Sequence, residues 1–266
     1  MLLRNVFTKT VRDLRWPTFW VALGMGAMTG YFALLFPTYS KIVDLNSILD
    51  KMGPAAKLLG ASLGDASTLI GFLHIELFSM ILPALMVAFA AGVASGFTAG
   101  EESRGTIDVL LSYPVSRRRL VLEKTLAVVM GCVVAAVSVW VFAVLGAAAS
   151  SSTLPGDKLA AALVMLVLLG LDFGGIALAI SATTGNRGVA IGIAVALMVA
   201  MYLVDALSAI IDSLGVVRPL SLFRYYMGDD PLRNGLNVLD AGLLATVAVA
   251  LLVVSVFAFD RRDLAS

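Results

Sequence analysis

Long apolar runs separated by short polar connections dominate the chain. Six such runs cover approximately residues 17–38, 70–98, 122–148, 158–182, 188–211 and 236–258. A helix that crosses the ~30 Å hydrocarbon core of a bilayer needs about 20 apolar residues, and each run supplies them. Lipid offers backbone amides no hydrogen-bond partner, and no run alternates in polarity, so each run is expected to be a helix. The pattern predicts an all-α integral membrane protein with six transmembrane helices.

Composition agrees with this fold class. Hydrophobic residues make up 60% of the 266 residues and charged residues 14%, and the mean hydropathy is +0.97. Soluble domains carry about 25% charged residues. The net charge of +1 gives no electrostatic reason to expect nucleic acid as a partner. No internal repeat or soluble segment divides the chain, so residues 1–266 are predicted to form a single transmembrane domain.

The distribution of basic residues predicts the orientation. With a cytoplasmic N-terminus, twelve of the 19 Lys and Arg residues fall inside the cell and seven fall outside it. Short cytoplasmic loops of membrane proteins carry an excess of Lys and Arg. Both termini are therefore expected in the cytoplasm, in a multi-pass protein of the plasma membrane.

The segments before and after the first apolar run are also patterned. Within residues 1–16, apolar positions recur at helical spacing opposite basic ones, which predicts a cytoplasmic amphipathic helix on the membrane surface. Its apolar positions are Leu3, Phe7, Thr10, Val11 and Leu14, and its basic positions are Arg4, Arg12 and Arg15. An ordinary basic flank that sets topology is the alternative. Segment 39–69 shows a similar pattern, broken at Gly53–Pro54, and is expected to lie on the outer surface.

The connection at residues 99–121 has the pattern of a short amphipathic helix. Thr106 can cap its N-terminus, Ile107, Leu110 and Leu111 form one apolar edge, and Pro114 ends it. Arg117, Arg118 and Arg119 then begin the next helix at the level of the lipid headgroups. A charged loop with basic anchors explains the arginines but leaves the apolar edge unexplained. A helix this short needs a docking surface.

Two segments resemble a known family. The loop from Glu101 to Arg117 resembles the signature E-E-x-x-G-T-[ILV]-[DE]-x-L-L-[SA]-x-P-[VI]-[ST]-R of ABC-2-type permeases, the membrane subunits of ATP-binding-cassette exporters. Residues 220–226 (LSLFRYY) and 230–232 (DPL) resemble the "LSPFRYY…DPL" segment of that family, within an outer hairpin at 212–235. Leu222 stands where that segment has proline.

This resemblance implies a transport subunit that is not itself an enzyme. The loop would be a coupling helix that docks on a separate cytoplasmic ATPase, and the N-terminal helix would give a second contact through Arg4, Phe7, Val11 and Arg12. The implied coupling residues are Glu101, Glu102, Arg104, Gly105, Thr106, Ile107, Asp108, Leu110, Leu111, Pro114 and Arg117.

The resemblance also implies an assembly. The chain contains no Gly-Lys dipeptide, so it has no P-loop, and ATP and Mg²⁺ would be bound by two copies of the partner ATPase rather than by this chain. A second permease copy, or a similar permease, would complete the pathway, surrounded by membrane lipid. The direction would be export. The cargo is not indicated.

Ionisable residues within the apolar runs are candidates for lining the pathway. These are Glu76, Asp172, Asp205 and His74, and charge at membrane depth costs several kcal/mol, about 3 on insertion scales. At 1.5 Å per residue, Glu76 and Asp205 would lie roughly 9 Å below the outer surface and Asp172 roughly 20 Å below it. Apart from Lys158 at the start of the fourth run, the fourth and fifth runs contain no basic residue that could neutralise the two aspartates. The acids could line an outward-opening cavity for neutral or cationic amphiphiles. Alternatively, they are protonated or bonded to neighbouring hydroxyls.

Other functions fit parts of the sequence. The same acids would suit a proton-coupled secondary transporter, although no inverted repeat is apparent. An intramembrane enzyme is the weaker alternative, because a single histidine excludes an H-E-x-x-H zinc motif. The one cysteine, Cys132, has no partner for a disulfide, and no metal-ligand spacing is present.

Overall fold

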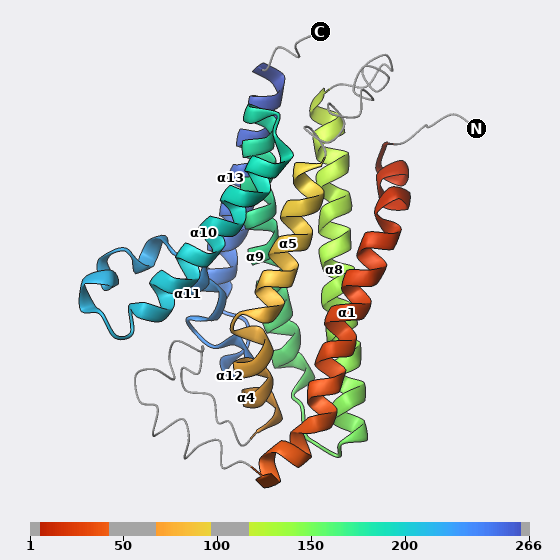
Figure 1. Ribbon diagram of the computed structural model, residues 1–266, viewed down its shortest axis with the longest axis vertical. Coiled ribbons are helices and arrows are strands. Elements are labelled where there is room, and N and C mark those ends of the chain that lie inside the picture. The colour runs from red at the N-terminus through yellow and green to blue at the C-terminus, as the bar shows by residue number, and fades with distance from the viewer. Residues whose placement is uncertain (1–5, 43–67, 97–116, 262–266) are drawn as a thin grey trace.

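The computed structural model describes residues 6–42, 68–96 and 117–261, and every regular element in them is helical (Figure 1). The long helices are α1 (Val6–Ile42), α5 (Ile81–Ser95), α8 (Arg117–Ala149), α9 (Gly156–Thr184), α10 (Arg187–Leu207) and α13 (Val238–Arg261). The short ones are α4 (Leu69–Leu73), η1 (His74–Phe78), η2 (Asp212–Val216), η3 (Arg218–Leu220), α11 (Leu222–Met227) and α12 (Pro231–Asn234).

The number of spans agrees with the prediction from sequence. Helices α1, α8, α9, α10 and α13 are each long and apolar enough to cross a membrane. The bent pair formed by residues 69–78 and 81–95 makes a sixth span if it is counted as one. The chain is thus an all-helical membrane protein, as the apolar runs predicted.

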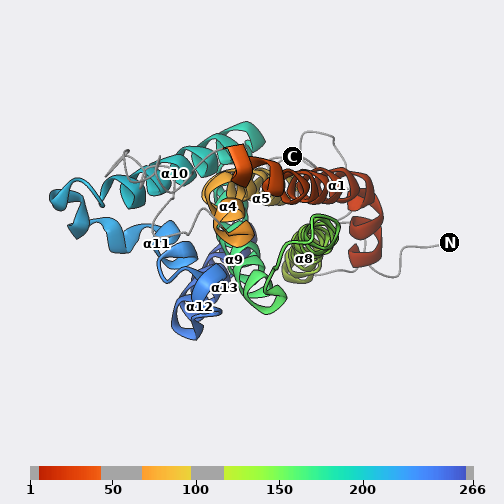
Figure 2. The same ribbon diagram turned by 90° about the horizontal axis from the view of Figure 1, so that it is seen from below.

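The long helices form two layers. Figures 1 and 2 together show α1, α5 and α10 in one layer, here called the front layer, and α8, α9 and α13 in the back layer. Helix α1 packs mainly along α8, and α5 along α9, which also contacts α10 and α13. Helices α1, α8 and α10 begin, and α5, α9 and α13 end, at one end of the bundle, the top of Figure 1. That end is called the upper end below, and the opposite one the lower end.

Small residues bring the two layers into close contact. A Cβ on Gly146 of α8 would lie 2.9 Å from the Gly30 carbonyl oxygen of α1. One on Gly174 of α9 would lie 3.2 Å from the Cβ of Ala90 in α5. The Ser138 hydroxyl also donates a 2.7 Å hydrogen bond to the Ala22 carbonyl across the α8–α1 contact. Such small-residue contacts let transmembrane helices associate by van der Waals packing.

The N-terminal helix differs from the expectation of a separate element at 1–16. Residues 6–42 form one continuous helix, so the predicted amphipathic segment from residue 6 onward is the beginning of the first span. Proline is tolerated within it at Pro17 because a transmembrane helix can re-satisfy a freed carbonyl locally. The predicted two faces are present: Thr10 is buried and Val11 half-buried, whereas Arg12 is exposed.

The second span is broken, which the apolar pattern of residues 70–98 did not predict. Helix α5 begins after a turn at Ser79 and Met80, and its axis is bent by 45° from the preceding segment. The physical cause is Pro83, which has no N–H and whose ring clashes with the carbonyl four residues earlier, that of Ser79. Residues 74–78 before the break form a π-helical turn, a geometry often found at functional sites.

Candidate functional site

The predicted coupling loop lies outside the described residues. This applies to Glu101, Glu102, Arg104, Gly105, Thr106, Ile107, Asp108, Leu110, Leu111 and Pro114, and to Arg4 of the N-terminal segment. Arg117 is the first residue of α8, and Phe7 lies in α1. The structure therefore describes α5, which precedes this loop, and α8, which follows it.

The end of α5, just before the loop, is fastened to the turn between α9 and α10. The Ser181 hydroxyl donates a 2.9 Å hydrogen bond to the Ser95 carbonyl oxygen. Arg187 Nη2 donates a 3.0 Å bond to the Gly92 carbonyl. The last four carbonyls of a helix lack backbone partners within it, and these two side chains bond to two of them. The Gly92 carbonyl also accepts a 3.3 Å hydrogen bond from the Ser95 hydroxyl. Neither contact is signalled in the sequence, because the partners lie 86 and 95 residues apart.

The hairpin between α10 and α13 is attached to the break in the second span. The Tyr226 hydroxyl of α11 donates a 3.1 Å hydrogen bond to the Phe78 carbonyl oxygen, directly before the break. Ser221 donates a 2.7 Å bond to the Met201 carbonyl of α10. We call Ser221, Phe223 and Tyr226 the hairpin clamp. Complete burial raises the pKa of the Tyr226 phenol well above its usual range, so it remains a proton donor.

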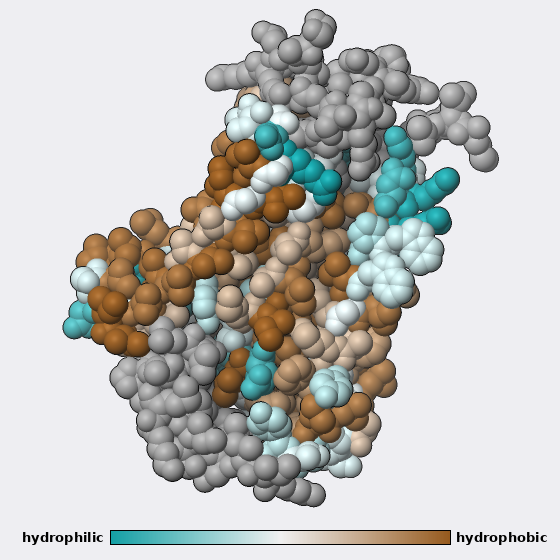
Figure 3. Space-filling model, in the orientation of Figure 1, coloured by the Kyte–Doolittle hydropathy of each residue, from teal (hydrophilic) through white to brown (hydrophobic). Residues whose placement is uncertain are grey.

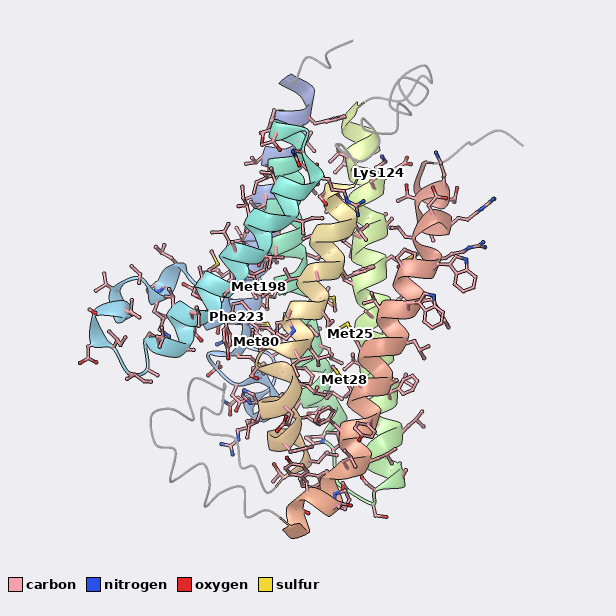
Figure 4. All side chains as sticks on the ribbon, viewed as in Figure 1. Met25, Met28, Met80, Lys124, Met198 and Phe223 are labelled. Carbon is pink, nitrogen blue, oxygen red and sulfur yellow. The ribbon has the colours of Figure 1, made fainter. Side chains whose placement is uncertain are left out.

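Aromatic packing completes this clamp. The Phe223 ring contacts those of Phe173 in α9, Tyr202 in α10 and Tyr226, with centroids 5.5–6.4 Å apart. Figure 4 shows Phe223 where α11 meets α10, at the height of Met80 in the broken span. The LSLFRYY segment stands out in the sequence by resemblance alone, and its geometry explains its composition. The hydroxyls of Ser221 and Tyr226 and the Phe223 ring join α9, α10 and the second span.

The four predicted pathway residues do not form one cluster. His74 is buried in the π-helical turn, with Nδ1 3.5 Å from Asp230 Oδ1 in the hairpin. Asp230 has a φ of +47° and also lies 3.8 Å from Arg233 Nε. Glu76 is half-exposed and has no hydrogen bond or ion pair with a described residue. Residues two apart on a helix face different sides, and Glu76 does not pair with His74.

The two aspartates have opposite environments. Asp205 Oδ1 accepts a 2.8 Å hydrogen bond from Arg218 Nε, so the hairpin supplies the cation that the spans lack. Asp172 is completely buried, and neither of its carboxylate oxygens has a hydrogen-bond partner among the described residues. Asp172 therefore does not line an open cavity in this conformation.

Two other features of the sequence bear on possible chemistry, a hydrolase-like pattern and the single cysteine. Residues 60–64 read Gly-Ala-Ser-Leu-Gly and match the G-x-S-x-G pattern of hydrolases, but they lie outside the described residues. Cys132 is buried within α8. In the described part of the chain, no group of three or more His, Cys, Asp or Glu side chains could hold a metal ion.

Comparison with known proteins identifies the family. A family model described as "ABC-2 family transporter protein" matches residues 7–264. A search of curated proteins gives no match. The family match covers all six spans, the segment at 99–121 and the hairpin. The chain therefore belongs to the ABC-2 transporter family and is a multi-pass membrane protein with a role in transport.

Proposed function

We propose that this chain is the transmembrane subunit of an ABC exporter, in which two permease copies enclose the pathway and two separate cytoplasmic ATPases supply the energy. The observation that carries the proposal is the family match together with the signature at 101–117. Helices α5 and α8, which flank that signature, meet at the upper end, where α1 also begins (Figure 1). This arrangement supports the proposal that the two predicted ATPase contacts lie at the same end of the molecule.

The upper end is proposed to face the cytoplasm. Near this end, the described helices carry Arg12 and Arg15 in α1, Lys124 in α8 and Arg187 in α10. Figure 3 shows polar side chains gathered toward this end and apolar ones over the middle of the front face. An excess of basic residues on one side marks the cytoplasmic side. The predicted coupling loop and both termini would then lie inside the cell.

Coupling would act through α5 and its anchors. Nucleotide binding by the ATPases would draw the two coupling helices together and move the upper ends of α5 and α8. Because Ser181 and Arg187 bond to the last turn of α5, that movement would also reach α9 and α10. The break at Ser79–Met80 divides the second span, so its upper part can tilt while the lower part stays with the hairpin.

A second copy is expected to cover α10 and the segment that follows it. Residues 208–220 project sideways from the bundle about halfway along its length (Figure 1), and they expose Ile210, Ile211, Val216 and Leu220. Irregular backbone at membrane depth is tolerated where protein or a water-filled cavity covers it, but not against lipid. With apolar side chains exposed, this projection is best explained as part of a two-fold interface.

The cargo is proposed to be an amphiphile that enters a pathway between the two copies. Glu76 is half-exposed and, unlike Asp205, has no ion pair with a described residue, so a carboxylate there would favour neutral or cationic molecules.

The proposal is tested by co-expressing the chain with the ABC ATPase encoded nearest to its gene. Co-purification and ATP hydrolysis in proteoliposomes are expected. Leu110→Glu should insert normally but reduce hydrolysis at least ~10-fold, because a charge would enter an apolar cleft. Val109→Glu, which adds the same charge off the apolar edge, is the control. A chain that transports without any ATPase would refute the proposal.

One observation supports a second candidate, a proton-coupled secondary transporter. Asp172 is a fully buried carboxyl without a hydrogen-bond partner among the described residues, as a proton carrier in a closed state would be. This candidate predicts that uptake of a cationic dye into vesicles depends on a pH gradient and is lost in Asp172→Asn. Dependence on ATP alone would exclude it.

A further inference from the structure

An apolar groove runs between α8 and α9 on the back layer, away from the hairpin clamp and the charged residues discussed above. Its volume is about 440 Å³, within the roughly 300–1,000 Å³ typical of small-molecule sites. Nine residues line it: Val133, Ala136, Val137, Trp140, Ala160, Leu163, Val164, Val167 and Leu168. The only polar atom among these side chains, Trp140 Nε1, already donates a 3.1 Å hydrogen bond to the Gly156 carbonyl. The groove therefore presents no polar side-chain group that water or a polar ligand would satisfy.

The dimensions of the groove match one hydrocarbon chain. Its lining extends from Val133 to Trp140 on α8 and from Ala160 to Leu168 on α9, each roughly 10–12 Å at 1.5 Å per residue. One leaflet contributes about half of the ~30 Å hydrocarbon core. A single acyl chain parallel to the two helices would fill this length. Both helices are long and apolar enough to cross a membrane, so lipid can reach the groove directly.

The groove also has one end suited to a lipid headgroup. Trp140 is bonded to the first residue of α9, so it marks the end of the groove nearest the lower surface, and tryptophan prefers the membrane interface. Asp157 lies three and seven residues before Ala160 and Val164, on the same helix face, and is exposed. A carboxylate at this position would attract the ammonium of an amine-bearing headgroup.

We propose that this groove is a binding site for one acyl chain of a bilayer phospholipid with an amine headgroup, held in the leaflet at the lower end. The site does not depend on the proposed transport function, since binding needs neither ATPase nor cargo. The groove lies between two back-layer helices, whereas the expected interface between copies is on α10 and residues 208–220 (Figure 2).

Photolabelling of the full chain in nanodiscs tests the site, with phosphatidylethanolamine carrying a diazirine on one acyl chain. We expect label in the peptides that contain 133–140 and 160–168. The double variant Val137→Phe and Val164→Phe should reduce that label at least fivefold, because the two rings would fill the groove. Both residues lie on its rim, are 54% and 45% exposed, and tolerate larger side chains. Val253→Phe with Val254→Phe, at 47% and 55% exposure on α13, should leave it unchanged.

Three results would overturn the proposal. The first is labelling that survives the groove-filling variant, and the second is labelling spread evenly over α13 and the groove. The third is disulfide cross-linking between copies through Val137→Cys and Val164→Cys, which would show that protein occupies the groove. The buried Cys132 gives little background in this last measurement.

Discussion

The phenol of Tyr226 satisfies a carbonyl at the place where the second span breaks. In a continuous helix, the Phe78 carbonyl would accept a hydrogen bond from within its own helix. Here it receives the Tyr226 hydroxyl at 3.1 Å, in a fully buried position. Tyr226→Phe should lower the free energy of unfolding by about 1–3 kcal/mol, since an unsatisfied buried acceptor carries its full desolvation cost. Thermal unfolding of the purified protein in detergent measures this loss.

The neighbouring residue provides a matched control. Tyr225 also donates its hydroxyl to a backbone carbonyl, that of Pro219 at 3.0 Å, but at an exposed position. Water can replace that bond, so Tyr225→Phe should change stability by less than ~0.5 kcal/mol. Equal effects of the two substitutions would show that burial of the Phe78 carbonyl does not determine the loss of stability.

Asp172 is the residue whose presence is hardest to explain by stability. A buried carboxyl without a partner is costly, so Asp172→Leu should leave the unfolding temperature unchanged or raise it. If the carboxyl serves the transport cycle, the same variant should reduce ATP hydrolysis in proteoliposomes by more than ~10-fold, or about 1.4 kcal/mol. Asp205→Leu, which breaks the half-exposed pair with Arg218, gives a comparison. Undiminished hydrolysis in Asp172→Leu would exclude a role for this carboxyl in an ATP-driven cycle.

The sequence identified these ionisable residues by their place in apolar runs, but not their partners. Asp205 pairs with Arg218 and His74 lies beside Asp230, both within a hairpin whose fold depends on contacts with the spans. Side-chain periodicity describes one helix at a time and carries no information on such pairings. That is why no neutralising cation was expected for Asp205.

At the scale of helices, small residues decide how closely α1 and α8 approach. A methyl group on Gly146 would lie 2.7 Å from the Ala33 Cβ and 2.9 Å from the Gly30 carbonyl oxygen. Gly146→Ala should therefore push the helices apart and cost about 1–3 kcal/mol, as overpacking does. Gly24→Ala in α1 is the control, because a Cβ added there would meet no atom within 4 Å. Equal thermal stability of the two variants would contradict the close approach.

The spans were predictable because each needs only length and apolarity, whereas their breaks and contacts follow from particular residues. Pro83 was visible within the second run, and its effect on the Ser79 carbonyl explains the bend at 79–80. Glycines four residues apart differ in their surroundings: Gly26/Gly30 and Gly170/Gly174 pack closely, whereas Gly92 and Gly192 meet no atom within 4 Å. The spacing alone could not separate these cases, because it does not say which face meets a neighbour.

At the scale of the whole molecule, two systems of contacts hold the second span, one at the upper end of α5 and one at the break. Ser181 and Arg187 hold the upper end of α5, next to the segment with the family signature. The hairpin clamp holds the region of the break. Between them lies α5, which begins after the bend at Ser79–Met80, and Asp172 is buried in the adjacent layer. Under the proposed function, movement produced at the upper end would reach the hairpin through α5 and the helices bonded to it, and α5 would link ATP hydrolysis to the pathway.

The front layer and its projection determine how two copies would associate. Both α10 and α13 are only 17% buried in their spanning windows, so exposure alone does not distinguish them. The irregular segment 208–220 distinguishes α10 from α13, because it continues from α10 and would need to be covered by protein at membrane depth. In a two-fold interface, a residue near the axis faces the same residue of the other copy. Val216→Cys, at a position 84% exposed, should therefore form a disulfide-linked dimer under mild oxidation.

Val254→Cys on α13, 55% exposed on the back layer, should remain monomeric under the same conditions. Disulfides require Cα atoms within about 7 Å, so a bond at Val216 would locate the axis closely. The native Cys132 is buried in α8 and should not contribute. Non-reducing gels of membranes, before any detergent is added, give the result without disturbing the assembly. Cross-linking at Val254 with none at Val216 would place the interface on α13, and the projection would then have to face a water-filled cavity instead of a second copy.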